Sequence, residues 1–268
     1  MKKINYIIVG QGLAGTIFAQ TLLKHGKTII VIDEPTLSKA SKIAAGLYNP
    51  VVFKRLVKSW MADELIPVMD EFYGDAEILL KTKFFFQKQI VKPFAEEQEK
   101  VLWIKKSKEA VGKYLGKIIP DNFLCDLIYA PLGASEIIKA GNLDTSTFLN
   151  SFKNYFKKNA CLLEEKFEYD QLLIFENSVT YKNIIADRII FCEGYKSLDN
   201  PYFNWLPFKL TKGEILTVKI PLFPRGFEKV INKGIFILPL ENKTYKVGAT
   251  YEWNDLNEQI TEKGKAEL

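Results

Sequence analysis

The strongest constraint on this chain is a glycine pattern that interrupts an apolar run near its beginning. Residues 6–9 are typical of a buried strand, and Gly10, Gly12 and Gly15 follow them at Gly-x-Gly-x-x-Gly spacing. In this pattern the first glycine permits a tight turn, the second lets the backbone approach a pyrophosphate, and the third lets a helix pack closely on a sheet. The N–H groups and the positive end of that helix favour a diphosphate. The stretch therefore predicts a dinucleotide-binding strand–turn–helix unit.

The residues after the glycines support this interpretation. The helix positions expected to face inward are Ala14, Ile17, Phe18, Thr21 and Leu22. Gly26 is expected to end the helix. A second apolar run, residues 28–32, leads to Asp33, close to the ~20 residues at which a carboxylate takes ribose hydroxyls in this motif. On these residues alone NAD fits as well as FAD, and a nucleotide-free Rossmann-like unit is the structural alternative.

Composition narrows the class of protein. The 268 residues suit one large domain or two interleaved smaller ones. The net charge of +5 comes from scattered lysines, which favours a solvated lysine surface over a surface that binds nucleic acid. No apolar run approaches ~18 residues, so we expect no membrane span and a cytoplasmic protein. Cys125, Cys161 and Cys192 are too widely spaced for a disulfide framework or a zinc site. With His25 as the single histidine, neither a histidine-based triad nor a metal site is expected.

Periodicity predicts the remaining elements along the chain. Helical patterns cover residues 53–72, 96–106, 145–158 and 256–268. Strand patterns cover residues 84–87, 89–91, 127–131, 134–139, 161–168, 172–175, 179–181 and 186–194. Residues 213–219, 227–231, 235–239 and 244–248 alternate as in an antiparallel sheet.

Four stretches carry a resemblance to a known family: residues 7–15 with Asp33, 41–50, 144–194 and 212–250. They resemble the D-amino-acid oxidase family of flavoproteins, which includes glycine oxidase and sarcosine oxidase. The resemblance implies FAD as cofactor and an α/β fold. A Rossmann-like FAD-binding domain with a parallel sheet is expected at residues 1–80 and 141–208. It is interleaved with an antiparallel-sheet α+β substrate domain at residues 81–140 and 209–268.

The resemblance also implies roles for individual residues. The diphosphate loop comprises Gly10, Gly12, Leu13, Ala14 and Gly15. Asp33 and Glu34 form the adenosine ribose site, and Ser41 reaches the diphosphate. Further cofactor contacts are Ala45, Gly46 and Leu47 along the flavin ring, the backbone of Phe167 or Glu168 at the adenine, and Gly194 close to the cofactor. Candidate substrate contacts are Tyr48, Phe236 and Thr250, and no catalytic side chain is assigned. Arg55 and Arg225 are the arginines expected to be free for a substrate carboxylate.

Two features depart from the family pattern. Family members continue through a Gly-x-Arg-Pro motif that supplies a substrate-binding arginine, and no such motif occurs in this chain. Phe236 occupies the position of a substrate-binding tyrosine in glycine oxidase, so that hydroxyl is missing. The chain therefore resembles a family member that lacks its C-terminal part.

The resemblance implies an FAD-dependent oxidoreductase that transfers hydride from an amine or amino acid to flavin, with oxygen as electron acceptor. One alternative is a non-catalytic flavin-binding remnant that could form a homo-oligomer through its unfinished sheet. Two others are a nicotinamide dehydrogenase and a flavin domain acting on a modified tRNA base. The modest charge disfavours binding to nucleic acid.

Overall fold

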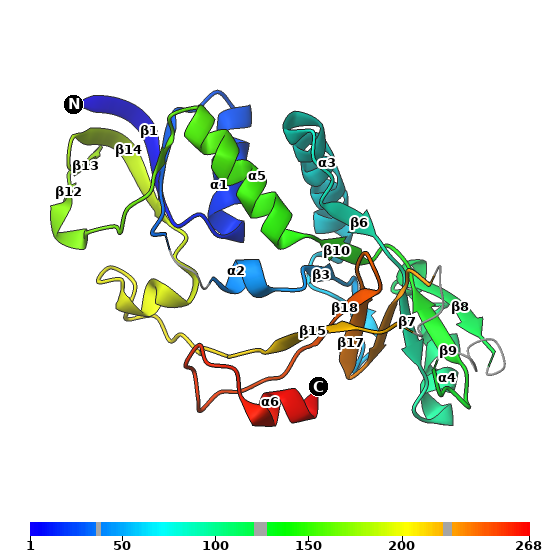
Figure 1. Cartoon of the computed structure of the whole chain (residues 1–268). Coiled ribbons are helices and arrows are strands. Elements are labelled where there is room, and N and C mark those ends of the chain that lie inside the picture. The colour runs from blue at the N-terminus through cyan, green and yellow to red at the C-terminus, as the bar shows by residue number, and fades with distance from the viewer. Residues whose placement is uncertain (36–38, 121–127, 222–226) are drawn as a thin grey trace. The chain divides into compact units, whose positions relative to one another are not determined.

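The chain folds into two compact units, each formed by two separate stretches of sequence. The computed structural model describes residues 1–35, 39–120, 128–221 and 227–268 (Figure 1). Unit 1 comprises Met1–Ala44 and Thr145–Leu210, and unit 2 comprises Ala45–Asp144 and Thr211–Leu268. Each unit is built around its own large sheet.

Unit 1 is built on a six-stranded sheet with the order β11-β2-β1-β14-β13-β12. The strands are β1 Lys2–Val9, β2 Ile29–Ile32, β11 Leu162–Leu163, β12 Leu172–Ile174, β13 Val179–Tyr181 and β14 Ile184–Phe191. The first four strands in this order are parallel, and β13 and β12 continue as an antiparallel meander. All four residues of β2 are buried, as expected for a parallel strand covered on both faces.

Helices α1 and α5 lie side by side in unit 1 (Figure 1). The helices of this unit are α1 Leu13–Lys24, α2 Ala40–Ile43, α5 Thr145–Lys158 and the 3-10 turns η3 Tyr169–Gln171 and η4 Gly194–Asp199. Helix α5 buries Phe148, Leu149, Phe152 and Phe156 at helical spacing, which fixes one face of it against the core. The prediction of a helix at residues 145–158 is confirmed.

Unit 2 is organised around a seven-stranded sheet with the order β15-β18-β17-β16-β7-β9-β8. Its strands are β7 Ile90–Pro93, β8 Leu115–Ile119, β9 Ala134–Ile137, β15 Ile215–Lys219, β16 Val230–Lys233, β17 Ile235–Pro239 and β18 Thr244–Gly248. Neighbouring strands are antiparallel except for the parallel pair β7 and β16. The predicted antiparallel sheet is thereby confirmed, and with it the mixed α/β fold class.

Unit 2 also contains two smaller sheets and several helices. Strands β3 Leu47–Tyr48, β10 Gly141–Leu143 and β6 Phe85–Gln87 form one small sheet, and β4 Val51–Val52 pairs with β5 Val57–Lys58. The helices are α3 Ala62–Leu80, α4 Glu97–Lys106, α6 Glu262–Glu267 and the 3-10 turn η1 Gly112–Tyr114. Trp103 of α4, which is 1 % exposed, packs into the same apolar cluster as Val230 and Leu238 of the large sheet.

The division into units differs from the predicted domains at residues 45–80. We expected this segment in the FAD-binding domain, whereas it belongs to unit 2. The reason is packing: Ala45, Val51 and Leu56 are buried in the apolar cluster of unit 2. β3 also pairs with β10, which pairs with β6. The other boundaries lie within a few residues of those predicted.

Several predicted elements differ from those observed. Residues 53–61 do not belong to a helix, because a hairpin of β4 and β5 precedes α3, and the buried Leu56 adopts a left-handed φ of 44° in its turn. The strand predicted at 161–168 contains only β11, and the helical pattern at 256–268 contains only α6. Residue 127 lies outside the described residues, and residues 128–131 form no strand.

Candidate cofactor site

Three parallel strands of unit 1 end together at one edge of the sheet. Val9 at the end of β1 is aligned with Ile32 of β2 on one side and with Phe191 of β14 on the other. The Gly10 N–H donates to the Ile32 carbonyl at 2.8 Å, and the Cys192 N–H donates to the Val9 carbonyl at 2.7 Å. The segments that leave these strands are therefore close to one another, where ligands bind in open α/β sheets.

A cavity of about 920 Å³ lies at this edge, and all its lining residues belong to unit 1. The lining consists of residues 9–14, 32–34, 39–41, 166–170, 191–197 and 199. The cavity thus joins the glycine loop, the end of β2, the start of α2 and the segments after β11 and β14. It brings together all the predicted residues of unit 1 except Gly15, namely Gly10, Gly12, Leu13, Ala14, Asp33, Glu34, Ser41, Phe167, Glu168 and Gly194.

Gly10 and Gly15 are required by close backbone packing. A Cβ on Gly10 would lie 2.4 Å from the Cys192 carbonyl oxygen, and Gly10 has a left-handed φ of 98°. A Cβ on Gly15 would lie 1.9 Å from the Gly10 carbonyl oxygen. Both distances are far below any real Cβ contact, so these glycines hold α1 and β14 against the end of β1.

The start of α1 faces the cavity. Gly12 is its N-cap and has no side chain to cap the helix, and no acidic residue lies in the first turn. The Leu13 N–H donates to the Ser41 Oγ at 3.2 Å, and a Cβ on Gly12 would lie 3.3 Å from this oxygen. The hydroxyl of Ser41 therefore lies at the positive end of the helix, where a diphosphate would be stabilised.

Asp33 is buried and already engaged by protein donors. Its side chain is 6 % exposed. Its Oδ1 accepts from the Gln11 N–H at 2.9 Å and from the Lys39 ammonium at 2.6 Å, and its Oδ2 accepts from Lys39 at 2.5 Å. The carboxylate lies at the cavity and also fixes the backbone of the glycine loop, and its contact with ribose stays a prediction.

Glu34 is linked to the opposite side of the cavity lining. Its Oε2 accepts from the Lys196 ammonium at 3.0 Å, and both side chains are 42 % exposed. The hydrogen bond from Lys196 is the main reason why the pKa of Glu34 lies below its usual value. This ion pair connects the end of β2 with η4, on the other side of β1.

An aromatic group forms another wall. Phe167 is 7 % exposed and stacks on Tyr181 with ring centroids 4.5 Å apart, and its ring meets Phe191 edge-on. The Glu168 N–H donates to the Tyr181 hydroxyl at 3.3 Å. The backbone at 167–168 borders the cavity, and its contact with adenine stays a prediction.

The turn that contains Gly194 is fixed by a polar network. The Tyr169 hydroxyl donates to Glu193, whose other carboxylate oxygen accepts from the fully buried Asn200 amide at 2.6 Å. Burial and the neighbouring Glu193 raise the pKa of Tyr169. Gly194 itself has a φ of 61°, the left-handed region that favours glycine. The network holds one wall of the cavity in place.

The predicted ring-contact segment Ala45, Gly46 and Leu47 belongs to unit 2. Tyr48, which follows it, stacks on Phe85 with ring centroids 5.3 Å apart, and a Cβ on Gly141 would lie 2.7 Å from its hydroxyl oxygen. Burial, followed by the charge of Asp70, raises the pKa of Tyr48. Its surroundings are those of a packed aromatic residue.

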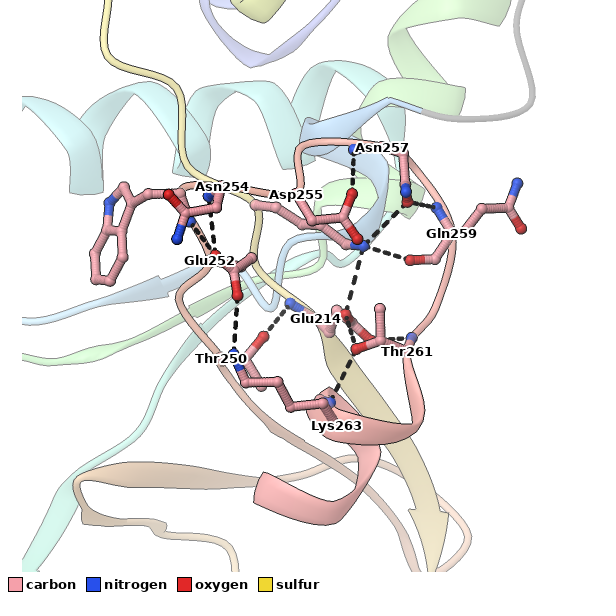
Figure 2. A network of polar contacts seen from close by, with 12 residues as sticks. Glu214, Thr250, Glu252, Asn254, Asp255, Asn257, Gln259, Thr261 and Lys263 are labelled. Atoms are coloured by element: carbon pink, nitrogen blue, oxygen red, sulfur yellow. Dashed lines mark hydrogen bonds and ion pairs between the residues drawn. The ribbon is translucent and has the colours of Figure 1, made fainter.

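The other candidate substrate residues also have packing roles in unit 2. The Phe236 ring lies over Gly248, where a Cβ would meet it at 3.0 Å. Thr250 is 4 % exposed, and its hydroxyl accepts from the Glu214 N–H at 2.9 Å (Figure 2). Arg55 is exposed in the turn of the β4–β5 hairpin, and Arg225 lies outside the described residues. Contact of Tyr48, Phe236 or Thr250 with substrate stays a prediction.

The cavity residues that were not predicted include Gln11, Lys39 and Lys196, whose polar side chains fix parts of the lining. Gln11 is 3 % exposed, and its amide donates to the Leu149 carbonyl at 2.9 Å, which ties the glycine loop to α5. A polar side chain between two loop glycines was the available signal for it. Lys39 and Lys196 pair with the two predicted ribose carboxylates, and nothing local in the sequence distinguishes them from the other lysines.

The residues present fit an adenine dinucleotide. The glycines leave space that a Cβ would fill, the N-terminus of α1 is open to an anion, and a carboxylate follows β2. Among the described side chains, no group of three or more His, Cys, Asp or Glu residues is placed to hold a metal ion. None of the described helices combines the length and apolar character needed to cross a membrane.

Comparison with known proteins identifies the family. Residues 5–268 match the DAO family, described as FAD dependent oxidoreductase. A glycine oxidase from Bacillus cereus ATCC 14579 superposes with a TM-score of 0.76 at 18% identity, over 99% of this chain and 76% of that one. An iminodiacetate oxidase from Chelativorans sp. BNC1 superposes with a TM-score of 0.74 at 17% identity, over 98% of this chain and 76% of that one. A dithionite-reduced L-alpha-glycerophosphate oxidase from Mycoplasma pneumoniae with FAD bound superposes with a TM-score of 0.68 at 13% identity, over 100% of this chain and 77% of that one.

At such identities the structural likeness shows a shared fold, and the family match covers nearly the whole chain. This chain belongs to the DAO family of FAD-dependent oxidoreductases, and its cofactor is FAD.

Proposed function

We propose that this chain oxidises a small amine or amino acid by hydride transfer to FAD, with oxygen as the electron acceptor. The observation that carries the proposal is the cavity of unit 1, where the glycine cradle, Ser41 and Asp33 suit the adenosine diphosphate part of the cofactor. The amine class is supported by the names of two structures of the same fold, a glycine oxidase and an iminodiacetate oxidase.

Each unit has a role in this proposal. Unit 1 is the FAD-binding unit: residues 10–15 and Ser41 hold the diphosphate, Asp33 and Glu34 the ribose, and Phe167 and Gly194 border the nucleotide. Unit 2 supplies Ala45, Gly46 and Leu47 to the flavin ring and carries the substrate contacts Tyr48, Phe236 and Thr250.

The protein contributes positioning more than acid–base chemistry. Bound FAD supplies the hydride acceptor, so the side chains must bind, orient and exclude water. In unit 1 the orientation comes from rigid features: the backbone packing at Gly10 and Gly15, the Gln11 link to α5 and the Tyr169–Glu193–Asn200 network. The first two features fix the loop that receives the diphosphate, and the network fixes the turn that contains Gly194.

The test begins with flavin binding and continues with turnover. Purified chain is expected to show flavin absorbance or to take up added FAD, and Asp33→Asn is expected to weaken uptake. Peroxide release is then measured with glycine, iminodiacetate, L-proline and L-α-glycerophosphate. Absence of FAD uptake would contradict the cofactor site. Oxidation of glycerophosphate with none of the amines would contradict the amine class while leaving the cofactor site intact.

A further inference from the structure

The carboxylate proposed for the adenosine ribose has little capacity left for a ligand. Each carboxylate oxygen accepts about two hydrogen bonds. Asp33 Oδ1 already accepts from the Gln11 N–H and from Lys39, and Oδ2 accepts from Lys39. One acceptor position remains, whereas the 2′- and 3′-hydroxyls of a ribose offer two donors. A ribose that engages Asp33 with both hydroxyls must therefore displace the Lys39 ammonium.

Lys39 lies where the diphosphate of a bound cofactor would offer it an alternative partner. It immediately precedes α2, and Ser41, two residues further on, accepts from the Leu13 N–H at the start of α1. The backbone of this segment is thus anchored beside the diphosphate loop, and Lys39 itself lines the cavity. A lysine ammonium is a compact charge on a flexible four-carbon stem. It can change partners by side-chain rotation alone.

The charge of the lining favours such a change. The lining contains six acidic residues, namely Asp33, Glu34, Glu168, Asp170, Glu193 and Asp199, and three lysines, Lys39, Lys166 and Lys196. Lys196 is paired with Glu34. A diphosphate brings about two further negative charges to this surface. The positive end of α1 offsets part of them, and a charge-assisted hydrogen bond from Lys39 would offset more.

We propose that Lys39 exchanges partners when the cofactor binds, leaving Asp33 to the ribose hydroxyls and donating to the FAD diphosphate. This proposal rests on the cofactor site proposed for unit 1. Lys39 is then a specificity residue: it competes with the ribose of any nucleoside, and only a ligand that also carries phosphate compensates for that competition.

The test compares adenosine, ADP and FAD as ligands of the full 268-residue chain freed of flavin, with isothermal titration calorimetry as the measurement. In Lys39→Met, ADP and FAD are expected to bind about tenfold more weakly, because a charge-assisted hydrogen bond is lost. Adenosine is expected to bind about threefold more tightly, because Asp33 becomes free for both hydroxyls. Weaker binding of ADP and FAD together with tighter binding of adenosine is the result that partner exchange predicts.

Three further variants serve as controls for this result. Lys39→Arg keeps the charge and is expected to bind ADP within about threefold of the unmodified chain. Lys182→Met removes the lysine of another ion pair of unit 1, Lys182–Glu165 at 3.0 Å, which lies outside the cavity lining, so both affinities are expected to stay unchanged. Should Lys39→Met fail to fold with Asp33 left unpaired, Asp33→Asn with Lys39→Met must still bind ADP more weakly than Asp33→Asn alone.

The outcomes separate the alternatives. Unchanged or tighter ADP binding in Lys39→Met, or in the double variant, would overturn the contact with the diphosphate. Unchanged or weaker adenosine binding in a folded Lys39→Met would overturn the competition at Asp33. An unmodified chain that binds neither ADP nor FAD would overturn the cofactor site itself and this proposal with it.

Discussion

Gly15 packs so closely on Gly10 that a Cβ on Gly15 would lie 1.9 Å from the Gly10 carbonyl oxygen. This contact brings α1 against the end of β1 and aims the helix N-terminus at the cavity. Gly12, between them, has a different role, since a Cβ there would meet only the Ser41 Oγ, at 3.3 Å. We therefore expect Gly15 to matter for folding and Gly12 to matter for ligand binding.

Substitution of each glycine tests this separation. Gly15→Ala is expected to lower the stability of the flavin-free chain by about 3 kcal/mol, the upper range of overpacking costs, because α1 must move off β1. Gly12→Ala is expected to keep the fold, since its φ of −84° suits alanine, and to weaken FAD binding by crowding Ser41 and the diphosphate loop. Thermal unfolding and FAD titration measure the two effects. A Gly15→Ala chain that unfolds at the unmodified temperature would contradict the packing argument.

The glycine loop could be predicted because its requirements are local. Gly10, Gly12, Asp33 and Ser41 line the cavity and Gly15 packs on Gly10, while their contacts with the cofactor stay predictions. The inward face of α1 was predicted wrongly: its buried residues are Gly15, Thr16 and Ala19, whereas Phe18 is 37 % exposed. Small residues face the sheet because the helix approaches so closely, and hydrophobic periodicity cannot show this.

Other features depend on partners distant in the chain. Lys196 meets Glu34 across 162 residues of sequence, and Gln11 meets the Leu149 carbonyl across 138. Residues 45–80 contain no signal that assigns them to one unit, because their place is set by strand pairing of β3 with β10. Such tertiary relationships override local pattern, and a single sequence contains little information on them.

Helix α5 offers a test of the core of unit 1. Phe152 is fully buried, with its ring centroid 5.0 Å from that of Phe148 and 5.5 Å from that of Phe156. Phe152→Ala is expected to lower the free energy of unfolding by about 3–5 kcal/mol, since a cavity remains in place of the ring. Phe152→Leu, which fills most of that volume, is expected to cost about half as much. Urea unfolding measures both, and equal costs would indicate that the cluster is loosely packed.

Two substitutions of Tyr48 distinguish a packing role of its ring from a ligand-binding role of its hydroxyl. Its ring stacks on Phe85 and covers Gly141, so Tyr48→Phe is expected to preserve stability and FAD content. Tyr48→Ala removes the ring and is expected to cost about 2 kcal/mol, because the side chain is only partly buried. Stability is measured by urea unfolding and turnover by peroxide release. A Tyr48→Phe chain with normal stability but a raised KM would assign the hydroxyl to the substrate.

Acid stability should depend on the network in Figure 2. Glu252 accepts from the N–H groups of Trp253 and Asn254, both at 2.9 Å, and from Lys263 at 3.0 Å. The backbone hydrogen bond from Asn254, followed by Lys263, lowers the pKa of Glu252 from 4.5 to about 2. Because the pKa is lower in the folded chain than in the unfolded one, the ionised carboxylate stabilises the fold above about pH 5, and this contribution is lost as the pH falls toward 2.

Glu252→Gln removes this pH dependence. The variant is expected to unfold at a lower temperature than the unmodified chain at pH 7, with the difference shrinking as the pH approaches 3. Glu262→Gln is the matched control, because the Glu262 side chain is 93% exposed and its Oε2 lies 3.9 Å from the Lys265 Nζ. It should change the melting temperature little at any pH. The measurement is the melting temperature by circular dichroism between pH 3 and 7, and a Glu252→Gln curve parallel to that of the unmodified chain would contradict the lowered pKa.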